Sequence, residues 1–105
     1  MTLAIDRASS GFPSHERFLL AAQLRRAAVS SCANLVEGYG RLGPKELRRF
    51  LGITLGSLTE VDALLLVAKD LGYLDQPTHQ SLREHYLAAS KATYGLLRAI
   101  RRPPM

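Results

Sequence analysis

The chain lacks several features on which very small or membrane-bound proteins depend. Its 105 residues include one cysteine, Cys32, and no tryptophan. A single cysteine excludes an intrachain disulfide, and its place in an apolar helical pattern predicts a small core residue rather than a nucleophile. No apolar run approaches the roughly 20 residues that span a bilayer, and the N-terminus has no signal-peptide pattern. We therefore expect no membrane partner and a cytoplasmic location.

Motifs that hold metals, phosphates or catalytic groups are also missing. His15, His79 and His85 have no carboxylate or cysteine at ligand spacing, so we expect no metal site and no cofactor. The glycines between residues 38 and 43 follow a helix instead of a strand and lack the lysine-serine element of a phosphate-binding loop. A nucleophile, base and orienting group cannot be assembled, so we predict a protein that is not an enzyme.

The pattern divides the chain into four helices of one domain, at about residues 2–10, 14–38, 44–71 and 75–101. Ser14 and Asp75 are the expected N-caps of the second and fourth helices, and Pro44 suits the first position of the third. The Gly38–Gly40 stretch and Gly72 are expected to end the helices before them. No segment has the alternation of a strand. The sequence predicts an all-α, up-down antiparallel four-helix bundle with a short first helix.

The third helix is apolar on more than one face. One stripe consists of Leu47, Phe50, Leu51, Leu58, Val61, Leu65 and Ala68, and a second consists of Ile53, Leu64, Val67 and Leu71. A helix of this kind is central in a bundle or is also buried against another subunit. Gly52 and Gly56, four residues apart, permit another backbone to come close.

The second helix carries two opposite faces. Its polar line consists of Gln23, Arg26, Ser30, Asn34, Glu37 and Arg41, at steps of three and four residues. Its apolar stripe consists of Leu24, Ala28, Cys32, Leu35 and Val36. We expect the polar line before Arg41 to hold helices or subunits in register, in a network that also includes Arg25, Ser57 and Glu60.

The positive charge gathers at one end of the predicted bundle. The formal net charge is +5, and eleven of the fourteen basic residues are arginine. The up-down topology places these residues at one pole: Arg41, Lys45, Arg48, Arg49, Arg98, Arg101 and Arg102. Such a basic pole can neutralise several phosphates, and arginine suits carboxylates of a protein partner equally well. A solvated rim that complements helix dipoles is the alternative interpretation.

Several separated motifs resemble one bacterial family of four-helix bundle proteins. They are Gln-Leu-Arg-Arg-Ala-Ala-Val-Ser at 23–30, Asn-Leu-Val-Glu-Gly-Tyr-Gly-Arg at 34–41, Leu-Gly-Ser-Leu-Thr-Glu at 55–60, and the stretch 66–74. The family includes proteins encoded in intervening sequences of large-subunit ribosomal RNA genes. It is similar in fold to the accessory variability protein of diversity-generating retroelements. The resemblance covers about residues 3 to 100 and implies a homopentamer of up-down bundles that binds nucleic acid.

The first helix is shorter than this resemblance implies. We expect uncovered apolar surface, oligomerisation, or a start codon further upstream. The leading hypothesis is a non-enzymatic, homo-oligomeric accessory protein whose basic pole contacts RNA or DNA phosphates. The alternative is a protein-interaction module that docks a reverse transcriptase, another polymerase or a nucleoprotein. An enzyme with Glu37 and Glu60 as an acid/base pair ranks third, because ion pairs with Arg25 or Arg26 explain both carboxylates better.

Overall fold

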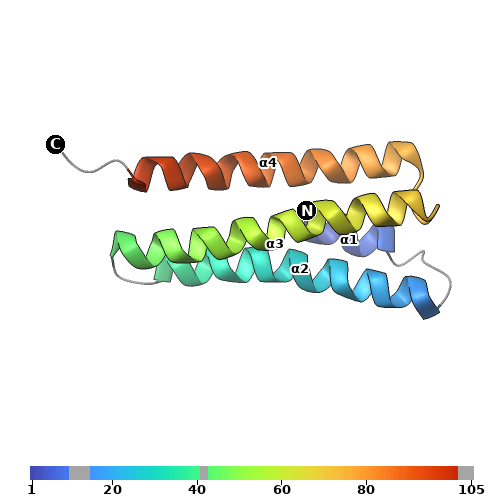
Figure 1. Cartoon of the computed structure of the whole chain (residues 1–105), viewed down its shortest axis with the longest axis horizontal. Coiled ribbons are helices and arrows are strands. Elements are labelled where there is room, and N and C mark those ends of the chain that lie inside the picture. Colours follow the sequence, from blue (N-terminus) through green and yellow to red (C-terminus); the bar gives the residue numbers. More distant parts are fainter. Residues whose placement is uncertain (10–14, 41–42, 102–105) are drawn as a thin grey trace.

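The computed structural model describes residues 1–9, 15–40 and 43–101, with the side chains of residues 15–17, 39–40 and 101 left out. Its helices are α1 (Thr2–Ser9), α2 (His15–Gly40), α3 (Pro44–Asp70) and α4 (Gln76–Arg101) (Figure 1). The described ranges contain no strand, and the three long helices alternate in direction. This confirms the all-α up-down bundle with a short first helix. The predicted N-cap Ser14 lies outside the described residues.

The central helix is α3, which lies between α2 and α4 (Figure 1). Its Leu51, Leu58 and Leu65, at seven-residue steps, are each at most 2% exposed. The short helix α1 packs on α2 and on α4, on the side of the bundle away from α3. Because α2 and α4 do not approach each other closely in the described ranges, α3 forms the floor of a trough between them. We call this channel the trough.

The helix α1 fills only one end of the trough. At that end its Ile5, 1% exposed, joins a cluster that includes Leu24, Leu65 and Leu82 from the other three helices. We call this part, near the α3–α4 connection, the closed half. The open half is the rest of the bundle, toward the α2–α3 connection, where no described helix covers the trough (Figure 1).

The connection between α3 and α4 follows the sequence prediction closely. Gly72 has φ of 79°, in the left-handed region, and the amides of Gly72 and Tyr73 donate to the carbonyl oxygens of Lys69 and Ala68, both at 2.9 Å. This pair of hydrogen bonds is the Schellman motif that ends a helix at glycine. The N-cap of α4 is Asp75, whose Oδ1 accepts from the Thr78 amide at 2.8 Å. Local sequence therefore determines this turn.

The end of α2 differs from the prediction. The helix does not stop at Gly38 but runs to Gly40. Gly38 is buried against α3, where an added Cβ would lie 2.9 Å from the Cβ of Phe50 and 3.1 Å from Cδ1 of Leu47. The glycine is needed because α2 and α3 come into close contact here, and not because the helix ends.

The apolar stripe of α2 is buried along only part of its length. Leu24 and Ala28 are at most 1% exposed, whereas Val36 is 68% exposed and Cys32 is also exposed. The prediction that Cys32 is a core residue was wrong. The physical reason is that α1 covers Leu24 and Ala28, in the closed half, and does not extend over Cys32, which lines the open part of the trough. Val36 is not part of that lining.

In the described ranges, α3 is long and apolar enough to cross a membrane, by length and composition only. The sequence-based expectation that no apolar run approaches the length of a membrane span does not hold for α3. The central helix of a bundle passes the same test, and α3 is packed between two helices here. Its Asp62 forms an ion pair with Arg83 of α4 at 3.3 Å, which ties the two helices together.

Candidate nucleic-acid interface

Four of the predicted cations are described, and they lie at one pole. The first turns of α3 supply Lys45, Arg48 and Arg49, and the last turns of α4 supply Arg98; all four side chains are exposed. They share a pole because α3 begins where α4 ends in the up-down order (Figure 1). Arg101 is the last residue of α4, without a described side chain, and Arg41 and Arg102 lie outside the described residues.

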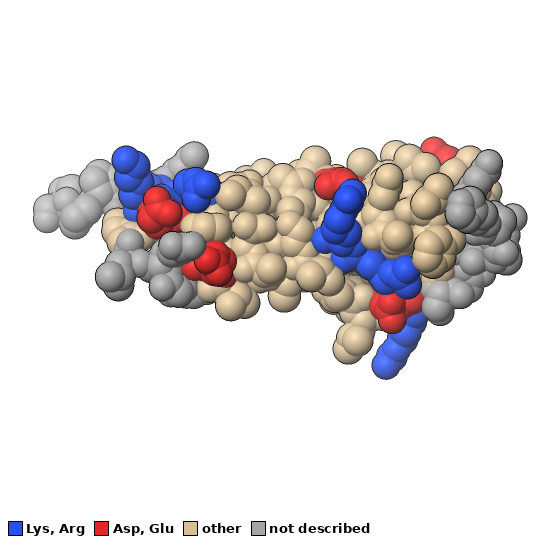
Figure 2. All heavy atoms as spheres, turned by 90° about the horizontal axis from the view of Figure 1, so that it is seen from below, with Lys and Arg blue, Asp and Glu red and all other residues tan. Residues whose placement is uncertain are grey.

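The face seen in Figure 2 shows how charge is divided along the molecule. Basic and acidic side chains gather at the end that carries the α2–α3 connection, and a second charged group lies nearer the other end. An uncharged stretch separates the two groups on this face. On this face, therefore, the charged side chains at the α2–α3 end are separate from the second group.

The cations of the pole differ in how strongly they are engaged. Nη1 of Arg49 lies 3.8 Å from Oε2 of Glu46, and its guanidinium lies 5.2 Å from the ring centre of Phe50. Both side chains of the ion pair are exposed, by 63% and 44%, so the pair contributes little to stability. Within the described residues, Lys45, Arg48 and Arg98 have no ion-pair partner.

The start of α3 adds a helix terminus to these cations. Its N-cap is Gly43, which offers no side-chain hydrogen bond to the first-turn amides, and Pro44 follows at the first helical position. Amides without a side-chain cap and the positive end of the helix dipole both favour an anion nearby. Glu46 in the same turn opposes this effect. The first turn of α3 thus combines a positive helix end with the exposed cations Lys45 and Arg48, three residues apart.

A family model described as 23S rRNA-intervening sequence protein matches residues 1–95. The chain belongs to this family. Comparison with curated proteins finds no significant match. The family match includes Lys45, Arg48 and Arg49, and it ends before Arg98. The α3 cations therefore lie in the part of the chain that the family model matches.

Three members of the predicted polar network meet between α2 and α3. The hydroxyl oxygens of Ser30 and Ser57 are 3.1 Å apart. The amide nitrogen of Asn34 donates to the Ser30 carbonyl oxygen at 2.8 Å and to its hydroxyl oxygen at 3.2 Å. Ser30 and Asn34 are one turn apart on α2, and the antiparallel contact places Ser57 of α3 beside them. Of these hydrogen bonds, only that between Ser30 and Ser57 joins the two helices and marks their register; the two Asn34 bonds lie within α2.

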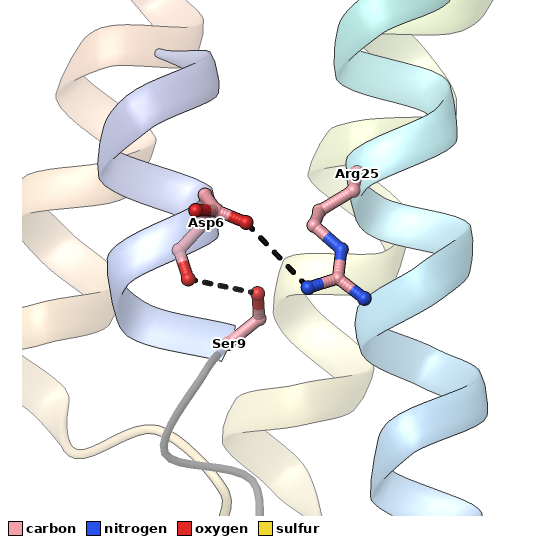
Figure 3. A network of polar contacts seen from close by, with 3 residues as sticks. All are labelled: Asp6, Ser9 and Arg25. Atoms are coloured by element: carbon pink, nitrogen blue, oxygen red, sulfur yellow. Dashed lines mark hydrogen bonds and ion pairs between the residues drawn. The ribbon is translucent and has the colours of Figure 1, made fainter.

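Other predicted members lie elsewhere. Gln23, Arg26 and Glu60 are exposed and take no part in these hydrogen bonds. Arg25 does not pair with Glu37 or Glu60: its Nη1 lies 3.5 Å from Oδ1 of Asp6 on α1 (Figure 3). That interpretation was wrong because α1, whose position the helical pattern of α2 does not reveal, brings its own carboxylate to this site.

The register also separates the two candidate catalytic carboxylates. The Ser30–Ser57 contact aligns Glu60 with Ala27, which is ten residues before Glu37. At 1.5 Å per residue the two carboxylates are about 15 Å apart along the bundle. They cannot act on one substrate atom as an acid/base pair. Within the described residues, no group of three or more His, Cys, Asp and Glu is placed to hold a metal ion.

Sequence reasoning missed two buried members of the α2–α3 contact. The Thr54 hydroxyl donates to the Ser31 carbonyl oxygen at 3.2 Å, and the Ser31 hydroxyl donates to the Ala28 carbonyl oxygen at 2.7 Å. Both side chains are at most 5% exposed. Their spacing could have indicated this contact, because Thr54 is three residues before Ser57 and Ser31 is next to Ser30. Both residues lie among apolar neighbours in the sequence and were not singled out.

Proposed function

We propose that this chain is a non-enzymatic accessory protein that acts in the cytoplasm and binds RNA or DNA phosphates at its basic pole. The observation that carries the proposal is that Lys45, Arg48 and Arg98 are exposed at one pole without an ion-pair partner in the described residues. Because these side chains form no ion pair within the protein, no such pair has to be broken when they bind phosphate. The description of the matching family names 23S rRNA, so RNA is the first ligand to test.

The test removes two charges from the pole. Lys45→Gln/Arg48→Gln should weaken binding to a labelled 23S rRNA fragment by about tenfold at low salt, because each cation is expected to neutralise a phosphate. The slope of log affinity against log salt should fall by about 0.7 to 0.9 per lost contact. Fluorescence anisotropy across a salt series measures both quantities, and a DNA duplex of equal length compares the two nucleic acids.

A control variant of equal charge separates local contact from net charge. Lys69→Gln/Lys91→Gln removes two cations that lie away from the pole, on α3 and α4. We expect this variant to retain most of the affinity and the full salt slope. If both double variants lose affinity equally, binding follows net charge and the proposed site is wrong.

We also propose that copies of the chain assemble through the outer face of α3, with a pentamer as the expected state. Ile53, Leu66 and Val67 on α3 are 40%, 49% and 44% exposed. An added Cβ at Gly52 or Gly56 would meet nothing within 4 Å, so neither glycine is required by packing within the chain. Close approach of a second copy would explain both. Mass measurement in solution tests the assembly. Gly56→Leu is expected to give smaller species than the wild type. A stable wild-type monomer would contradict the proposed assembly.

The second candidate function is a protein-interaction module that docks a polymerase, such as a reverse transcriptase, or a nucleoprotein. It is favoured by exposed apolar side chains on α2, where Val29 and Val36 are 53% and 68% exposed. Here the arginines would bind acidic protein surface. Excess polynucleotide should displace a partner that binds the basic pole, because its phosphates compete for the same cations. It should not displace a partner that is bound through apolar contacts.

A further inference from the structure

Two exposed helix faces of the chain have complementary shapes. On the outer side of α2, the bulky apolar side chains of Val29 and Val36 are 53% and 68% exposed, and Ala33 between them is also exposed. We call these three residues the α2 face. The α3 face is a line of small and apolar residues at steps of three and four, all exposed: Gly52, Gly56, Thr59, Ala63 and Leu66. An added Cβ at either of its glycines would meet nothing within 4 Å, so the line is open to a bulky neighbour.

The two faces lie on opposite sides of the α2–α3 pair. An α-helix turns by about 100° per residue. Gly38 of α2 is buried against α3, so Val36 and Val29, two and nine residues before it, lie on the other side of α2. The Thr54 hydroxyl of α3 donates to α2, so the glycines two residues before and after it lie on the other side of α3. The two faces therefore cannot meet within one chain, but they can meet between copies.

The register within the chain predicts which residues of two copies would meet. It places Val36 within one residue of the level of Gly52, and it places Val29 level with the turn from Gly56 to Thr59. Rotation about an axis parallel to the bundle leaves the level of every residue unchanged. In copies related by such a rotation, each valine of the α2 face therefore lies opposite a glycine of the next copy's α3 face, within about one helical turn. A bulky side chain then packs into the space beside a small one.

Charged side chains flank the two faces at one level. Arg26 is three residues before Val29, and Glu60 is three residues before Ala63. Both are exposed, and neither has an ion-pair partner within the described residues. The same register places Arg26 within one residue of the level of Glu60. At the rim of a contact between copies, this pair of opposite charges would add little affinity but would favour one alignment.

We propose that copies of the chain form a closed ring in which the α2 face of one copy packs on the α3 face of the next. This inference rests on the assembly proposed above and adds the surface that covers α3. A contact of α3 with α3, or of α2 with α2, would bury one face and leave the other in water, whereas a head-to-tail contact buries both. Every copy in this ring points the same way, so the basic poles of all copies lie at one end and can contact one nucleic acid together.

The first test measures the mass of the assembly by light scattering. Val36→Glu should reduce the mass toward that of one chain, 11.6 kDa, because the contact would bury the new carboxylate against apolar surface. Leu87→Glu makes the same change on α4, where the side chain is 46% exposed and outside both faces, and should keep the wild-type mass. Circular dichroism checks that both variants remain folded, as their exposed positions lead us to expect.

Disulfide formation tests the pairing of the faces directly. Val36→Cys/Gly52→Cys, in a Cys32→Ser background, should oxidise to covalently linked chains of two or more copies, because the two sites are close only between neighbours. Val29→Cys/Gly52→Cys is the matched control: Val29 is seven residues, about 10 Å, from the level of Val36, and should give no linked species. Each single-cysteine variant should stay unlinked, because a head-to-tail contact does not bring identical positions together.

The outcomes separate this inference from the assembly proposed above. A wild-type protein with the mass of one chain would contradict both. An oligomer that Gly56→Leu dissociates, but that Val36→Glu leaves intact and Val36→Cys/Gly52→Cys does not link, would overturn only the α2 face as the partner surface. Linked dimers of Val36→Cys or Gly52→Cys alone would also overturn it, because they indicate a two-fold contact.

Discussion

The closed and open halves of the bundle are built from the same three long helices, yet they differ in burial. In the closed half, Leu24 of α2 is 1% exposed; in the open half, Leu35 of the same helix is only half-buried and lines the open part of the trough. Both residues are in one apolar stripe of the sequence. The difference comes from α1, which covers one half and not the other. An apolar pattern thus predicts which face can pack, and the neighbouring helix decides whether it does.

The two halves also differ in their charges. The closed half contains the ion pairs Arg25–Asp6 and Arg83–Asp62. At the end of the open half, Lys45, Arg48 and Arg98 lack ion-pair partners among the described residues. These ion pairs are exposed and contribute little to stability, so the two halves differ in charge pairing and not in electrostatic stabilisation.

The largest expected effect compares one leucine from each half. Leu65→Ala, at a site with 0% exposure, should lower the free energy of unfolding by about 3 kcal/mol, because it leaves a cavity among four helices. Leu35→Ala, on the wall of the unfilled trough, should cost about 1 kcal/mol or less. Urea denaturation measures both values, and equal losses would show that the open half is as well packed as the closed half.

Helix packing within the open half is expected to be close at some positions and open at others. Gly38→Ala should lower the free energy of unfolding by about 1–3 kcal/mol, because its Cβ would lie 2.9 Å from that of Phe50. Gly95→Ala, on α4 where an added Cβ meets nothing within 4 Å, should raise it by about 0.5–1 kcal/mol through helix propensity. Thermal melts of the two variants should move in opposite directions. A shift of the same sign would contradict the tight α2–α3 contact.

A smaller effect is expected from a defect in the closed half. His79 is 8% exposed, and its Nε2 has no hydrogen-bond partner among the described residues. His79→Leu keeps a similar volume and removes the unpaired nitrogen, so the free energy of unfolding should rise by about 1 kcal/mol. His85→Leu, at an exposed position, should change it by less than about 0.5 kcal/mol. A clear loss of stability in His79→Leu would reveal a partner for the ring.

The smallest effect concerns the pH dependence of the turn between α3 and α4. The Thr78 hydroxyl, followed by its amide, holds the pKa of Asp75 below the ordinary value of 3.8. A lowered folded pKa stabilises the protein above the unfolded value, and this contribution is lost as the pH falls through the folded value. Asp75→Ala should therefore melt below the wild type at pH about 7, and the gap should narrow below pH about 4.

A control for this pH effect lies in the last turn of α3. Asp70→Ala removes a carboxylate at a helix C-terminus, where negative charge is unfavourable, and should not lower the melting temperature at neutral pH. A gap between wild type and Asp75→Ala that stays constant with pH would mean that the charge of Asp75 has no part in capping.

The features that could be predicted from the sequence are those that depend on residues a few positions away in the chain. Gly72 and Asp75 were predicted from local signals because a C-terminal glycine and an N-cap act on amides within a few residues. The contact of Ser30, Asn34 and Ser57 was within reach because helical spacing and an antiparallel turn are enough to align them. The interpretations of Gly38, Cys32 and Arg25 failed because each depends on contact with another helix.

The sequence by itself determined four helices, their order and the gathering of positive charge toward one end, because periodicity and capping are properties of short segments. Only the tertiary structure decided which apolar residues are covered. The extent of α1, the close contact at Gly38 and the unfilled trough beside Cys32 all depend on where helices distant in sequence lie against one another. The trough follows from that arrangement, since the same apolar stripe of α2 is core beneath α1 and surface beyond it.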